Sequence, residues 1–132
     1  MRERYIMGVD IGSSNVKAII FSLRGEVVSV GSKEIPDIIP GENMLEQSPK
    51  LIWEQFCKAV KSCVDSSAID PSKIMGLGID SNRCGMILLD EHHTPLTNVV
   101  TWRDRRAILE ATKYHAEHAD IEHYKITGET GT

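Results

Sequence analysis

Short runs of apolar and β-branched residues alternate with turn residues through the first quarter of the chain. Residues 5–11, 16–23 and 27–32 are such runs, and turns containing glycine separate them at 12–15 and 24–26. Runs of this composition, bounded by turn residues, are typical of β-strands. Because strands joined by turns this short run in opposite directions, we predict a three-stranded antiparallel meander.

The apolar pattern changes to a helical period after residues 36–47, which hold two prolines and no periodicity and are predicted to be a loop. Ser48 and Pro49 are a typical N-cap and first helical residue. Apolar side chains then recur at steps of three and four residues, which predicts an amphipathic helix over 48–66. The residues of this stripe are Leu51, Ile52, Phe56, Ala59, Val60, Cys63 and Val64.

The second half of the chain predicts a further strand, a hairpin and a helix. Residues 74–79 are glycine-rich and apolar enough for a central strand. Residues 86–89 and 98–102 are predicted to pair as a hairpin, and the helix is predicted from Arg103 to about His118. Since no linker divides the chain, these elements indicate one α/β domain over residues 1–132.

Composition excludes several classes of function. The 132 residues carry a net charge of −4, whereas a nucleic-acid-binding domain normally shows a basic face. No apolar run is long enough to span a bilayer, so no membrane partner is expected. The three cysteines have no metal or redox spacing, which favours a reduced, cytoplasmic protein. Cys57 and Cys63 are interpreted as small core residues.

The first candidate for chemistry is the segment Asp10-Ile11-Gly12-Ser13-Ser14. It places a carboxylate at the end of a strand, before a turn rich in backbone N–H groups and hydroxyls. Successive N–H groups can cradle phosphate oxygens, and Asp10 could hold Mg²⁺ directly or through water. Lys17 could reach a phosphate from the next strand. The alternative is a plain hairpin turn, for which Gly and Ser are ordinary choices.

The strand–DIGSS–strand opening resembles the phosphate hairpin of the actin-like ATPase superfamily. Three later segments resemble the FGGY carbohydrate kinases: the helix entry at 46–53, the strand and hairpin at 74–90, and Thr101-Trp102-Arg103-Asp104-Arg105-Arg106. They come in that family's order and at its spacing. The resemblance runs from about residue 6 to the end of the chain.

The resemblance implies a ribonuclease-H-like α/β fold, here incomplete, as the N-terminal part of the first kinase domain. It implies transfer of the ATP γ-phosphate to a hydroxyl of a sugar or polyol, with Mg²⁺. The family's general base and adenosine pocket belong to parts absent here, so the chain alone is expected to be inactive. The alternative function is a non-catalytic actin-like binding module that keeps the phosphate hairpin.

The same resemblance assigns a substrate loop after strand 74–79. Glycerol kinases place Gln-Arg-Glu at the positions of Asn82, Arg83 and Cys84. Xylulokinases place Gln-Met-His there, followed by a glycine like Gly85, and ribulokinases carry an aspartate like Asp80. Because no subfamily fits throughout, the substrate stays open between a xylulose-like and a glycerol-like compound.

Trp102 and Asp104 border the sugar pocket in the resembling family, where Asp104 could accept hydrogen bonds from hydroxyls. The alternative is that Trp102 packs and that Asp104 caps a helix and pairs with Arg105 or Arg106.

The predicted sheet has too few helices to cover it. The apolar stripe of the helix predicted at 103–118 is thin, and strand 74–79 suits burial on both faces. One edge and part of one face are therefore expected to be bare, which predicts a homodimer or larger assembly.

Overall fold

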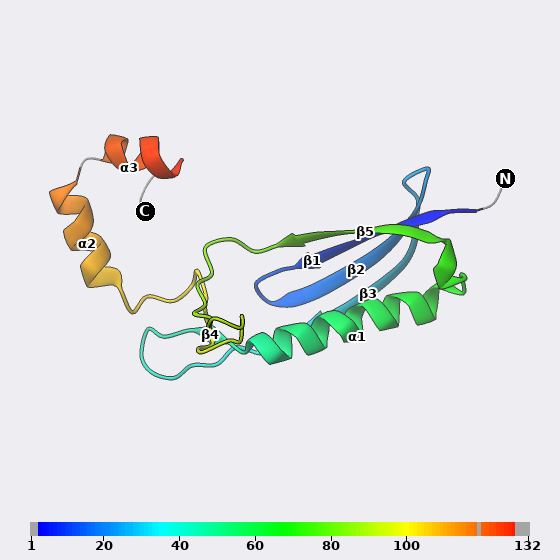
Figure 1. Ribbon diagram of the computed structural model, residues 1–132, viewed down its shortest axis with the longest axis horizontal. Coiled ribbons are helices and arrows are strands. Elements are labelled where there is room, and N and C mark those ends of the chain that lie inside the picture. The colour runs from blue at the N-terminus through cyan, green and yellow to red at the C-terminus, as the bar shows by residue number, and fades with distance from the viewer. Residues whose placement is uncertain (1–2, 119, 129–132) are drawn as a thin grey trace.

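The computed structural model describes residues 3–118 and 120–128, and it combines a four-stranded sheet with one long helix (Figure 1). The elements in chain order are β1 (Tyr5–Ile11), β2 (Asn15–Ser22), β3 (Val27–Glu34), β4 (Glu46–Gln47), α1 (Pro49–Ser67), the 3₁₀ turn η1 (Pro71–Lys73), β5 (Ile74–Ser81), β6 (Val99–Val100), α2 (Ile108–Glu117) and α3 (Asp120–Thr127).

The sheet has the strand order β3-β2-β1-β5. Its first three strands pair antiparallel, which confirms the predicted meander. The chain then crosses the sheet through α1, and β5 pairs parallel to β1. The sheet is therefore mixed. Strand β5 is its edge strand, so the central position predicted for residues 74–79 is wrong for this sheet.

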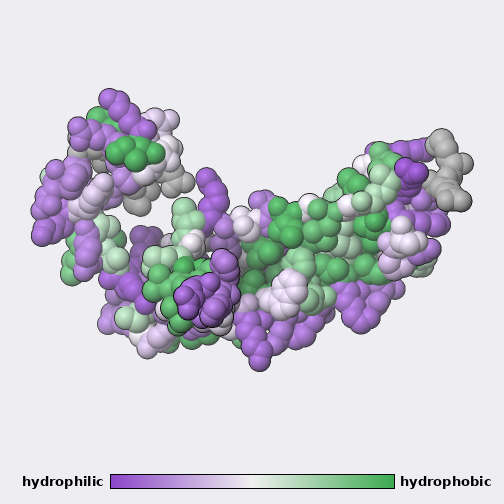
Figure 2. Space-filling view, in the orientation of Figure 1, coloured by the Kyte–Doolittle hydropathy of each residue, from purple (hydrophilic) through white to green (hydrophobic). Residues whose placement is uncertain are grey.

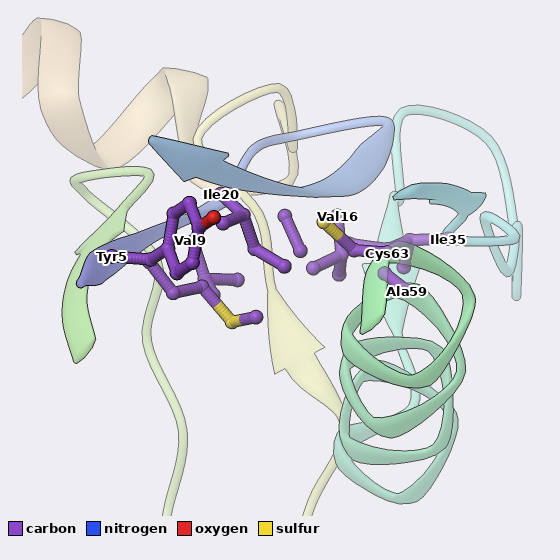
Figure 3. Packing of buried hydrophobic residues seen from close by; sticks show 9 residues of the cluster. Tyr5, Val9, Val16, Ile20, Ile35, Ala59 and Cys63 are labelled. Atoms are coloured by element: carbon purple, nitrogen blue, oxygen red, sulfur yellow. The ribbon is translucent and has the colours of Figure 1, made fainter. Parts of the chain in front are cut away.

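One face of the sheet forms the core against α1. Alternate residues along a strand point to opposite faces, and in β1 and β2 one of the two sets is buried. Figure 3 shows these side chains meeting the small residues of the helix. The core consists of Tyr5, Met7, Val9, Val16, Ala18, Ile20, Ile35, Ala59 and Cys63.

Helix α1 packs very close to the sheet at Gly31 of β3. A Cβ at residue 31 would lie 2.6 Å from Cys63 N and would also overlap the carbonyl oxygen of Ala59. Two hydrogen bonds join the same surfaces: Ser29 Oγ donates to Cys63 O at 2.8 Å, and Cys63 Sγ donates to Ser29 O at 3.4 Å. Only glycine allows the helix to lie this close.

The start of α1 agrees with its prediction. Ser48 Oγ accepts a hydrogen bond from Leu51 N at 3.4 Å, and the helix is capped at its C-terminal end by Ala68, which is left-handed at φ 54°. Cys63 is fully buried, as predicted for a core residue, but Cys57 is exposed and its predicted core role is wrong. Cys57 falls outside the helix stripe that faces β2 and β3.

Long-range pairing changes the elements predicted for the other segments. Residues 46–47 of the predicted loop form β4, which pairs with β6. The predicted hairpin is present as single bridges, Met86 with Val100 and Leu89 with Pro95. Helix α2 begins at Ile108 instead of 103, because the intervening residues form turns around Asp104. Helix α3 was not predicted.

Large apolar side chains are exposed on the sheet and its β5 edge. Leu77 and Ile79 of β5 are 49% and 59% exposed, and Ile6 and Val30 are exposed on the face opposite α1. Figure 2 shows hydrophobic residues gathered over the sheet, and Figure 1 shows α2 and α3 standing away from it. The expectation of a bare edge and a partly bare face is confirmed.

None of the helices formed by the described residues has both the length and the apolar character needed to cross a membrane.

The contact at Gly31 gives a stability prediction. Gly31→Ala should lower the free energy of unfolding by about 2–3 kcal/mol, because the new methyl group overlaps helix backbone that cannot move alone. Gly76→Ala in β5 is the matched control, since a Cβ there meets nothing within 4 Å. Denaturant titrations of both variants measure the difference. Equal midpoints would show that α1 is not held at this distance.

Candidate functional site

Three charged residues that the sequence predicted from separate segments lie side by side on three neighbouring strands of the sheet. The register places Asp10 of β1 opposite Lys17 of β2 and, on its other side, opposite Asp80 of β5. All three are exposed, because they alternate with core positions or lie on the edge strand. Together with Gly8 and Gly78 they help to line a shallow hollow of about 430 Å³. Asp10 and Lys17 are therefore neighbours on adjacent strands.

The turn that follows Asp10 is tight. Gly12 N donates to Asn15 O at 2.9 Å, and a Cβ at residue 12 would lie 3.2 Å from that oxygen and 3.8 Å from the Asp10 carboxylate. Across residues 3–118 and 120–128, the backbone N–H groups of Ser13 and Ser14 have no hydrogen-bond acceptor. Two adjacent N–H groups without an acceptor suit an anion such as phosphate.

Ser13 is held by side chains from two distant segments. Its carbonyl oxygen accepts hydrogen bonds from Gln47 Nε2 at 2.8 Å and from Arg103 Nη2 at 3.3 Å. Its hydroxyl oxygen accepts one from Trp102 Nε1 at 2.8 Å. The predicted phosphate turn and the predicted sugar-pocket segment are therefore in direct contact.

Asp37 completes this arrangement, since its Oδ1 accepts from both Gln47 Nε2 and Arg103 Nη2 at 2.8 Å. Gln47 is 1% exposed, and its amide nitrogen donates to both of these acceptors. The sequence alone did not indicate that Asp37, Gln47 or Arg103 are site residues. Only the position of Gln47, directly before the helix cap, could have drawn attention to it.

The predicted substrate loop lies beside the phosphate turn. Asn82 N donates to Ile11 O at 2.9 Å, and Asn82 Nδ2 donates to Gly12 O at 3.3 Å. Arg83 and Cys84 are exposed, and Cys84 has a left-handed backbone at φ 61°. Asn82 thus joins the loop to the turn.

Asp104 uses its carboxylate within the protein. Oδ1 accepts from the backbone N and Nε of Arg106, and Oδ2 accepts from Leu45 N and Arg106 Nη2, all within 2.9 Å. A carboxylate has about four lone-pair positions, and these four bonds fill them. The predicted pairing with Arg106 is confirmed, but Asp104 does not cap α2, which starts at Ile108.

A network of charges surrounds this pair. Arg106 Nη2 also donates to Glu46 Oε1 at 2.7 Å, and Asn98 Nδ2 donates to Glu46 Oε2 at 3.0 Å. The hydrogen bond from Arg106 holds the pKa of Asp104 well below its usual range. Hydrogen bonds from Arg106, which has the larger effect, and from Asn98 lower the pKa of Glu46.

Trp102 does not pack in a core. Its side chain is 55% exposed, and its single polar group is bonded to Ser13. The packing alternative for Trp102 is therefore wrong, and the exposed ring remains available for contact with a ligand.

The chain is similar in sequence to known carbohydrate kinases. The family model "FGGY family of carbohydrate kinases, N-terminal domain" matches residues 5–132. A glycerol kinase of Thermococcus gammatolerans is 30% identical over 129 residues, which are 98% of this chain and 25% of that protein. This chain thus spans about a quarter of the length of such relatives.

Solved structures of sugar kinases superpose closely on this chain. A gluconate kinase from Lactobacillus acidophilus gives a TM-score of 0.84 at 26% identity, over 93% of this chain and 24% of that one. A ligand-bound xylulose kinase from the same organism gives 0.83 at 26% identity, over 92% and 24%. These likenesses confirm the predicted α/β fold class, that of an actin-like N-terminal kinase domain.

The lowered pKa of Asp104 gives a prediction for stability against pH. Because the folded pKa lies below the unfolded value of about 3.9, the stabilisation is fully present above about pH 5 and is lost progressively as pH falls from there. Asp104→Asn should lower the melting temperature at pH 7 and flatten its decline between pH 5 and 2. Asp65→Asn, on the exposed side of α1, controls for the change in net charge. A decline as steep as in the unmodified chain would contradict the role of this pair.

Proposed function

Since this chain belongs to the FGGY family of carbohydrate kinases, we propose that it supplies the phosphate-binding part and one wall of the sugar pocket of an ATP-dependent kinase. The observation that carries the proposal is the turn at residues 12–14. Its Ser13 and Ser14 N–H groups have no acceptor among residues 3–118 and 120–128, and the turn joins the strands of Asp10 and Lys17 and contacts Trp102. An anion bound there lies beside both the charges and the candidate sugar contacts.

The phosphate and metal roles follow from the donor types. Gly12, Ser13 and Ser14 contact phosphate oxygens of ATP, and the Lys17 ammonium balances their charge. Asp10 is exposed and offers carboxylate oxygens, which are the ligands that Mg²⁺ prefers, and it holds the ion directly or through water. Bound Mg²⁺ neutralises charge on the phosphates during transfer.

The acceptor is a sugar or polyol, in keeping with the glycerol, gluconate and xylulose kinases that resemble this chain. We assign its contacts to Asp80, Asn82, Arg83, Cys84 and the exposed ring of Trp102. Asp104 shapes this pocket through Arg106 and Leu45, because its own acceptor positions are filled. A hydroxyl of the sugar could bind Asp104 only by displacing one of these bonds.

The catalytic base and the adenosine pocket are assigned to the three quarters of the relatives that this chain does not span. The intact enzyme is placed in the cytoplasm, where ATP is available and thiols such as that of Cys63 stay reduced.

The activity is tested with a chimera in which residues 1–132 replace the matching quarter of the Thermococcus gammatolerans glycerol kinase. Coupled ADP release is measured with glycerol, gluconate and xylulose. The chimera should turn over one of them, whereas residues 1–132 alone should show no turnover because general-base catalysis is missing.

Two variants of the chimera separate the proposed roles. Asp10→Ala should lower kcat by about 100-fold or more with little change in the KM for sugar, because its charge acts on the phosphate in the transition state. Arg83→Ala should raise the KM for sugar by about tenfold, the effect of losing one charged hydrogen bond. Turnover by the isolated chain, or the reverse pattern in the two variants, would contradict these assignments.

We also propose that residues 1–132 self-associate when they are not joined to the segments that complete the longer relatives. The exposed β5 edge, with Leu77 and Ile79, offers both unpaired backbone groups and apolar surface. Sedimentation across a concentration series should show a homodimer or larger species. Ile79→Lys should shift the equilibrium toward monomer, whereas the exposed Ile39→Lys in a remote loop should not. A monomer at high micromolar concentration would contradict the proposal, and a stable assembly without nucleotide binding would favour the alternative of a non-catalytic module.

A further inference from the structure

The contacts of Ser13 determine the direction of two groups that no protein atom uses. An indole N–H can only donate, so the bond from Trp102 Nε1 to Ser13 Oγ leaves the hydroxyl hydrogen of Ser13 to point elsewhere. Among the described residues no acceptor receives that hydrogen. Accepting a hydrogen bond also strengthens a hydroxyl as a donor.

The carbonyl of Ser13 fixes the second group. The C=O of one residue and the N–H of the next share a trans peptide plane and point in opposite directions. The Ser13 oxygen points toward Gln47 and Arg103, so the N–H of Ser14 must point away from them. This is one of the two N–H groups of the turn that have no acceptor in the described part of the chain.

The support of the Ser13 carbonyl is a closed ring of hydrogen bonds. Gln47 Nε2 and Arg103 Nη2 each donate to both Ser13 O and Asp37 Oδ1, so two donors and two acceptors alternate. Gln47 is 1% exposed. Rotation of the Ser13 peptide would leave a buried N–H of Gln47 without an acceptor, which is costly, so the ring resists that rotation.

We propose that Trp102, Gln47 and Arg103 are positioning residues for an anion: they aim the Ser13 hydroxyl and the Ser14 N–H at one phosphate group. The inference rests on the proposed function of the turn at residues 12–14 and adds to it three residues that do not touch the phosphate. It also accounts for a tryptophan whose ring is exposed but whose N–H is bonded inward.

The test follows the binding of inorganic pyrophosphate to the ¹⁵N-labelled 132-residue chain by NMR. In the unmodified chain, the Ser14 amide and the Trp102 indole N–H signals should shift together on titration. Trp102→Phe keeps an aromatic ring but removes the donor, and should weaken pyrophosphate binding by about 3- to 10-fold, the equivalent of one hydrogen bond. Its melting temperature should stay close to that of the unmodified chain, because residue 102 is exposed.

Two further variants complete the design. Gln47→Met removes a donor of the ring at similar volume and should weaken binding while shifting the Ser14 amide signal even without pyrophosphate. Should this buried substitution unfold the chain, Trp102→Phe alone carries the test. Trp53→Phe is the matched control on α1, where the tryptophan is 64% exposed and stacks on Phe56, and it should leave binding unchanged.

The possible failures are distinguishable. Normal pyrophosphate binding by Trp102→Phe and by folded Gln47→Met would overturn the positioning role and leave the phosphate turn intact. Absence of binding by the unmodified chain, with its sheet signals well dispersed, would overturn the phosphate turn itself and the positioning role with it.

Discussion

The close seat of α1 on the sheet at Gly31 is the constraint on which the site depends. No side chain separates β3 from the helix there, so the backbone of α1 lies directly against the strand and its position on the sheet is fixed. Ser48 is the N-cap of this helix, so the same contact also fixes the residue before it, Gln47. The amide of Gln47 then reaches the Ser13 carbonyl. A packing contact in the core is thereby connected to the geometry of the phosphate turn.

The alternation of the strands serves the core and the site together. The residues of β1 and β2 that point to α1 are apolar and buried, and the intervening positions carry Asp10 and Lys17. The parallel pairing of β5 adds Asp80 to this row. A shift of one residue in either pairing would bury charges and expose core side chains, so the hydrophobic effect that fixes the register also brings the charged groups together.

Polar contacts between distant segments hold the second half of the site. Asp104 and Arg106 connect the chain before α2 to Leu45 and Glu46, while Trp102 and Arg103 connect it to Ser13. The carboxylate of Asp104 accepts four hydrogen bonds within the protein, and Arg106 donates to Asp104 and Glu46. Few of their hydrogen-bonding groups are therefore left for a ligand. The turn at residues 12–14 differs, because the N–H groups of Ser13 and Ser14 have no acceptor in the described part of the chain.

The sequence by itself determined the elements whose signals are local. Turn residues and apolar runs specified the meander, the Ser48–Pro49 pair specified the start of α1, and the DIGSS turn indicated a phosphate site. Tertiary structure alone decided the pairing of β4 with β6, the start of α2 at Ile108 and the hydrogen bond from Trp102 to Ser13. The bond between Trp102 and Ser13 spans 89 residues of chain. No periodicity or turn preference extends that far, because such a contact exists only after packing has brought both segments to the same edge of the sheet.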